Sequence, residues 1–76
     1  MQVKVSGETP FKVLKDKVAI APTTSGYTLA YSADGVNFTA YSEATPANEN
    51  LVVTGLQQYM WLKLSGNTDT DVTVVL

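Results

Sequence analysis

The densest group of oxygen-bearing side chains in the sequence is Asn-Thr-Asp-Thr-Asp at residues 67–71. Carboxylate and amide oxygens are the ligands that a hard cation such as Ca²⁺ prefers. The segment has neither the ligand spacing of an EF-hand loop nor its distal bidentate glutamate. An acidic β-turn accounts for the same residues without any ligand, so we predict no metal site here.

A second candidate is the run Ser-Ala-Asp-Gly-Val-Asn-Phe-Thr at residues 32–39. It resembles the Asp-box and related Ser-x-Asp-Gly hairpins of extracellular β-proteins, which are structural more often than ligand-binding. We predict that Asp34 and Gly35 form a structural turn between two strands. In this turn Asp34 accepts hydrogen bonds from backbone amides, Gly35 adopts a positive φ, and Phe38 lies in the core.

The chain contains few residues suited to catalysis. A nucleophilic Ser or Thr needs a neighbouring base, and the sequence contains no His and no Cys. Nucleophile elbows, Ser-x-x-Lys elements, phosphate-binding loops, zinc-ligand spacings and dinucleotide fingerprints are absent. The acidic residues fall mostly in predicted turns, and a small sandwich rarely forms the cleft that a glycosidase needs. The sequence therefore predicts a protein that is not an enzyme, with no catalytic residues and no cofactor.

Aromatic side chains are the remaining candidates for function. The chain has four Tyr, two Phe and one Trp, and exposed aromatics on a β-sheet bind sugars or form the centre of a protein interface. Tyr41 falls out of phase with Phe38 in an alternating strand, so one of the two faces outward. Tyr59 and Trp61 share the Lys63 face of a predicted central strand. We predict Tyr41, Tyr59 and Trp61 as interface residues.

The elements that hold these residues are all strands. Val, Thr, Tyr and Phe recur with a period of two between Gly, Pro, Asn and Asp. The pattern predicts an all-β fold: a single small β-sandwich over residues 1–76, Ig-like or jelly-roll-like, with about eight short antiparallel strands. The predicted strands cover residues 3–5, 9–14, 17–21, 27–32, 36–41, 51–54, 59–64 and 72–76.

Three further expectations concern particular segments. Residues 59–64 are apolar on both faces, which indicates a central strand. Residues 42–50 contain Pro46 and few apolar side chains, which indicates a surface loop. The chain ends inside a predicted strand, so Leu76 is expected to be pinned in a sheet, either its own or that of a neighbouring molecule.

Composition limits the partners. The formal net charge is −2, and no basic stripe marks a nucleic-acid binder. Lys4, Lys12, Lys15 and Lys17 cluster near the N-terminus, where we interpret them as a solvated face rather than a contact with an acidic partner. No signal peptide or membrane-spanning run is visible. We therefore predict that the chain is made in a cytoplasm and does not associate with a membrane. A core this small is marginal, which favours stabilisation by a partner.

Three blocks of the sequence, residues 29–39, 43–49 and 63–74, taken in order resemble small accessory virion proteins of tailed bacteriophages. The most similar are auxiliary capsid (decoration) or head-fibre proteins of phages that infect gut Bacteroidales, including the crAss-like group. The resemblance implies a non-enzymatic β-sandwich on the capsid surface of the virion, made in the host bacterial cytoplasm. Its partners would be the major capsid protein or other virion proteins, and further copies of itself in a homo-oligomer.

A carbohydrate-binding or adhesin-like module is the alternative, with surface glycans as ligands. The two hypotheses differ in the surface they require. A sugar site should place two or three aromatic rings on one exposed, coplanar patch beside polar side chains such as Asn37 or Asn67. A capsid-docking face should be flatter and more apolar.

Overall fold

The computed structural model describes residues 1–46 and 48–76, with the side chains of residues 42–44 left out of the description. Eight strands and no helix occur in this part of the chain. Among the same residues, no helix has the length and apolar character needed to cross a membrane. The strands are β1 (Gln2–Val5), β2 (Phe11–Lys12), β3 (Val18–Ile20), β4 (Tyr27–Ser32), β5 (Thr39–Thr45), β6 (Leu51–Val53), β7 (Trp61–Ser65) and β8 (Val72–Val75).

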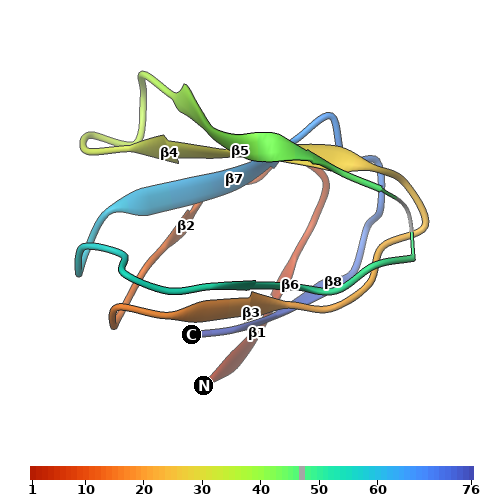
Figure 1. Ribbon diagram of the computed structural model, residues 1–76, viewed down its shortest axis with the longest axis horizontal. Helices are drawn as coiled ribbons and strands as arrows, with labels where there is room; N and C mark the ends of the chain where they lie inside the picture. The colour runs from red at the N-terminus through yellow and green to blue at the C-terminus, as the bar shows by residue number, and fades with distance from the viewer. Residues whose placement is uncertain (47) are drawn as a thin grey trace.

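The strands form two four-stranded antiparallel sheets, in the orders β1-β8-β3-β6 and β2-β7-β4-β5, which lie as two layers in Figure 1. Each strand pairs with the one that mirrors it along the chain: β4 with β5, β3 with β6, β2 with β7 and β1 with β8. A hairpin nested in this way and wrapped into two layers is a jelly roll. The predicted all-β sandwich is confirmed, and the strand order selects the jelly roll over the Ig-like alternative.

The core lies between the two layers and follows the predicted alternation. Phe11, Val13, Val18 and Ile20 are all buried, as their strand pattern predicts. The other buried members are contributed by both sheets and by the segment after β6: Val5, Tyr27, Leu29, Leu56, Leu62, Leu64, Val72 and Val74. Period-two burial of this kind is how a two-layer β-fold removes apolar surface from water.

The predicted central strand and the predicted last strand are both interior in the structure. β7 lies between β2 and β4, and β8 lies between β1 and β3. The backbone N–H of Leu76 donates to the carbonyl oxygen of Met1 at 2.8 Å, so the last residue is held in its own sheet. The expectations for both segments are therefore confirmed at the level of strand position.

Two strand boundaries differ from prediction in the central hairpin. β5 starts at Thr39 and runs to Thr45, so the predicted strand over 36–38 and the predicted loop over 42–45 are both wrong. The connection after β4 is a loop over residues 33–38, rather than a tight Asp-Gly turn. The register between β4 and β5 also shifts between Thr28 and Ala30. Such an irregularity bends and twists the paired strands.

The strand predicted from Tyr59 begins two residues later, at Trp61. Tyr59 has a left-handed backbone with φ of 70°, which no β-strand accommodates. A turn closed by the Met60 N–H donating to the carbonyl oxygen of Gln57 at 3.3 Å precedes the strand. The prediction that Tyr59 shares a strand face with Trp61 is therefore wrong.

Candidate binding surface

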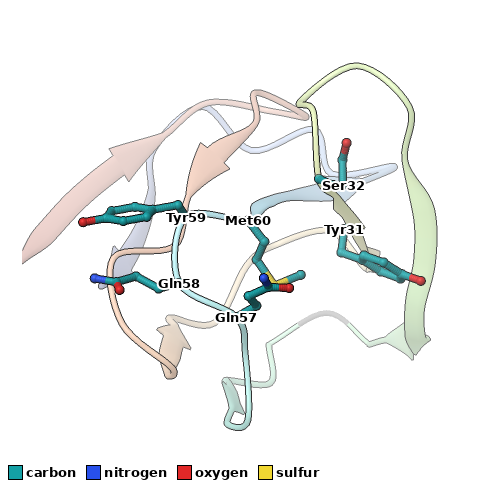
Figure 2. Close-up of a pocket in the computed structure, with 7 residues that line it drawn as sticks. Tyr31, Ser32, Gln57, Gln58, Tyr59 and Met60 are labelled. Atoms are coloured by element: carbon teal, nitrogen blue, oxygen red, sulfur yellow. The ribbon is translucent and has the colours of Figure 1, made fainter.

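Two adjoining hollows open beside the free edge of β5 and the segment that follows β6. Their volumes are about 360 and 470 Å³, and Tyr31, Gln57 and Met60 line both. Tyr59 contributes to the first hollow and Tyr41 to the second. Figure 2 shows Met60 and Gln57 between the side chains of Tyr31 and Tyr59. We call this surface the tyrosine groove, defined by these five residues.

Strands β4 and β5 position the two tyrosines of the second hollow. Tyr31 pairs with Thr39 across the sheet, which makes Tyr41 its diagonal neighbour. The two rings meet edge to face, with centroids 5.7 Å apart and an interplanar angle of 74°. Tyr31 is 40% exposed and Tyr41 is 36% exposed. Two amphipathic rings thus stand partly in water at an open side of the sandwich, where a partner can cover them.

Backbone contacts hold the segment that carries Gln57, Tyr59 and Met60. The Tyr59 N–H donates to the carbonyl oxygen of Val13 at 2.7 Å, and the Val13 N–H donates to that of Met60 at 2.8 Å. Tyr59 itself is 61% exposed. A left-handed tyrosine costs about 1–3 kcal/mol, and such strain gathers at functional sites. Here it turns an exposed aromatic side chain outward at the rim of the groove.

Trp61 lies apart from the tyrosine groove. It faces Lys12 across the β2–β7 pair, with the Lys12 Nζ 5.1 Å from the ring centroid. A Cβ built on Gly35 would lie 3.1 Å from the same ring, so the loop over residues 33–38 covers it. Of the predicted interface residues, Tyr41 and Tyr59 therefore come together in one surface and Trp61 does not.

Tyr31 is a groove residue that sequence reasoning missed. The sequence pattern places Tyr31 in an alternating strand, and the signal that could identify it is Tyr41, a residue of the same type on the neighbouring strand of the predicted hairpin. The sequence does not indicate that Gln57 and Met60 belong to the groove, because no local pattern places them beside that hairpin. A search for like aromatics on paired strands would find Tyr31, but neither Gln57 nor Met60.

We expect Trp61→Ala to lower stability, because the ring fills the space between β7 and the loop over residues 33–38. The expected loss is about 1–3 kcal/mol in the free energy of unfolding, measured by urea denaturation. Lys12→Ala serves as the control, because it removes the cation above the ring and leaves the ring in place. If Trp61→Ala keeps wild-type stability and instead loses partner binding, Trp61 is an interface residue as the sequence predicted.

The loop that covers Trp61 is organised by one carboxylate. Asp34 Oδ1 accepts hydrogen bonds from the Val36 N–H at 2.8 Å, the Asn37 N–H at 2.9 Å and the Ser32 hydroxyl at 2.7 Å. Gly35 has a positive φ of 77°. The structure thus contains the backbone hydrogen bonds expected of Asp34 and the positive φ expected of Gly35.

The sequence predicts Phe38 in the core, but in the structure this residue lies at the end of the same loop and outside the core. It is half-buried beneath Lys63, whose Nζ lies 4.6 Å from the ring centroid. Lys63 pairs with Ala30, so this contact covers the outer face of the sheet rather than the space between the layers. A loop longer than the predicted turn displaces Phe38 from the strand phase that would have aimed it inward.

These hydrogen bonds predict a loss of stability in acid. The Asn37 backbone amide, the Ser32 hydroxyl and the Val36 amide together hold the pKa of Asp34 well below the ordinary value of an aspartate. A carboxyl with a lowered folded-state pKa stabilises the fold above the unfolded-state pKa, and this contribution is lost as the pH falls towards the folded-state pKa. We expect Asp34→Asn to be less stable than wild type at pH 7. The difference should shrink as the pH falls from about 5 to about 2, and urea denaturation across that range measures it. A constant difference would contradict the assignment.

The second acidic motif joins three loops. Asp69 accepts hydrogen bonds from the Thr24 N–H at 2.7 Å and the Thr24 hydroxyl at 2.6 Å, and these contacts lower the pKa of Asp69. Asn67 is 3% exposed, and its Nδ2 donates to the carbonyl oxygen of Gly7. The side chains of Asn67 and Asp69 thus hold the protein's own loops together. Among the described residues, no group of three or more His, Cys, Asp or Glu is arranged to hold a metal ion.

No protein-family model, curated protein or solved structure matches this chain.

Proposed function

We propose that this chain is a non-enzymatic structural protein of a bacteriophage virion, and that it decorates the capsid by docking on the major capsid protein or another virion protein. The tyrosine groove is the docking surface. The sequence resemblance supplies the class of protein, and the groove supplies a surface suited to protein contact. Tyrosine and methionine are enriched in the buried centres of protein interfaces, where aromatic anchors carry most of the binding energy.

The carrying observation is that Tyr31, Tyr41 and Tyr59 are all partly or largely exposed around one apolar side chain, Met60. A small domain gains little by leaving three large rings in water. Covering them on binding would remove apolar area that contributes roughly 25 cal/mol per Å² before the costs of association. Many copies on one shell would add these contacts through avidity and stabilise the assembled capsid.

The same surface fits a carbohydrate ligand less well. Tyr31 and Tyr41 meet at 74°, so they offer no coplanar platform for a sugar ring. Asn37 donates its side-chain amide to Asp34 and lines neither hollow, and Asn67 is buried against Gly7, so neither polar side chain expected for a sugar site lies in the tyrosine groove. Jelly rolls occur both in viral capsid proteins and in lectins, so the fold is compatible with either function.

Co-sedimentation of the purified chain with capsids that lack it tests the proposal. We expect saturable uptake by the capsids and no signal when the same sample is applied to a glycan array. Binding on the array without uptake by capsids would overturn the proposal in favour of a carbohydrate-binding module. Absence of both would remove the tyrosine groove as a docking surface for either class of ligand.

A further inference from the structure

A second groove lies on the other open side of the sandwich, between the edge strands β1 and β2. It has a volume of about 470 Å³, and apolar side chains line most of it, including Val3, Phe11, Leu14 and Leu76. Lys4 and Lys12 lie along the same groove and are exposed. The tyrosine groove shares none of these residues, so the two surfaces are independent of each other.

The backbone of β1 is half unpaired. Met1 and Leu76 exchange two hydrogen bonds, with the Leu76 N–H donating at 2.8 Å and the Met1 amino group at 3.1 Å. Hydrogen-bonded and non-hydrogen-bonded pairs alternate along an antiparallel ladder. Because Met1 and Leu76 form a hydrogen-bonded pair, the pairs of Gln2 with Val75 and of Lys4 with Thr73 are non-hydrogen-bonded ones. Hence the N–H and C=O groups of Gln2 and Lys4 point away from β8, along the free edge of the sheet.

The side chains of β1 alternate between the two faces of the sheet. Val3 and Val5 pair with the buried Val74 and Val72, so they face the space between the layers. Lys4 faces the opposite side, where its Nζ donates to the Thr73 hydroxyl at 2.8 Å. A strand added beside β1 would continue this division. Its inward side chains would enter the apolar groove, and its outward side chains would lie next to Lys4.

We propose that the free edge of β1 binds an extended protein segment in which apolar and acidic residues alternate. The segment adds a fifth strand to the β1 sheet through the backbone groups of Gln2 and Lys4, a mode known as β-augmentation. Its apolar residues fill the groove and its carboxylates lie beside Lys4, with Lys12 across the groove adding positive charge. If the edges of two copies paired instead, the lysines of both copies would lie close together and repel one another, because β1 and β2 contain no acidic residue to balance them.

Peptide binding followed by amide hydrogen exchange tests the proposal. Three probes are compared: a short peptide of alternating Val and Asp, the same peptide with Lys in place of Asp, and a peptide of the first composition without the alternation. With the alternating Val–Asp peptide at saturation, we expect exchange of the Gln2 and Lys4 amides to slow by about tenfold or more. Both control peptides should bind at least about tenfold more weakly.

A matched pair of proline variants separates edge pairing from a loss of folding. Lys4→Pro removes one outward N–H of β1, and proline is tolerated on an edge strand where the N–H faces solvent. Val52→Pro is the control on β6, the other edge of the same sheet. The Ala21 N–H donates to Thr73, and alternation from this pair along β3 directs the backbone of Val52 outward as well.

Both variants are expected to keep the wild-type circular dichroism spectrum, and only Lys4→Pro should lose the Val–Asp peptide. Equal binding by Lys4→Pro and Val52→Pro would overturn the proposal, as would equal binding of the Asp and Lys peptides. Sedimentation of the free chain provides a third reading. A dimer that Lys4→Pro dissociates would identify a second copy as the occupant of the edge and would also overturn the proposal.

Discussion

Gly35→Val is expected to lower the free energy of unfolding by about 2–4 kcal/mol. Gly35 has φ of 77°, and a β-branched residue in this left-handed region is strained by about 1–3 kcal/mol. Its new Cβ would also lie 3.1 Å from the Trp61 ring, closer than ordinary van der Waals contact. The total stability of a domain of this size is often near 5 kcal/mol. A large part of the population is therefore expected to unfold at moderate temperature, which urea denaturation and thermal melting both measure.

Gly55→Val separates the two causes. Gly55 has a similar φ of 74°, but a Cβ built on it meets nothing within 4 Å. This control should show the backbone strain alone and cost less than Gly35→Val. Equal losses from both variants would mean that the contact with Trp61 contributes nothing. A loss below about 0.5 kcal/mol for Gly35→Val would show that Gly35 does not need its positive φ.

The double variant Tyr31→Ala, Tyr41→Ala is expected to bind capsids at least about thirtyfold more weakly than wild type. Truncation of an aromatic hot spot costs about 2 kcal/mol or more, which corresponds to this factor. The two rings contact each other, with centroids 5.7 Å apart, so their single effects should not add. Co-sedimentation over a range of protein concentrations gives the affinity, and each single variant measures the coupling.

Val36→Thr is the matched control for this experiment. Val36 is the most exposed of the large apolar residues at 77%, lies in the loop over residues 33–38, and lines neither hollow of the tyrosine groove. It should bind capsids as wild type does. The double variant is informative if its thermal melting stays cooperative, because both rings are partly exposed. Wild-type capsid affinity in a folded double variant would exclude the tyrosine groove as the docking surface.

The strands and their inward faces were predictable because both depend on neighbours along the chain. Alternation in 17–21 placed Val18 and Ile20 in the core, and the Asp34–Gly35 pair marked a turn through its own hydrogen-bonding groups. Errors occurred where a distant contact overrode the local pattern. Tyr59 continued an apolar run in sequence, yet its N–H bonds Val13 and its backbone is left-handed.

By itself, the sequence determined an all-β fold of about eight strands, the inward face of several strands and the backbone hydrogen bonds of Asp34. Only the tertiary structure decided the jelly-roll order, and with it the meeting of Tyr31 and Tyr41 with Gln57 and Met60. Period-two patterns fix which face of a strand is buried, but similar patterns on every strand do not specify which strand lies beside which. That choice rests on contacts between segments far apart in the chain, and the tyrosine groove exists only after those contacts form.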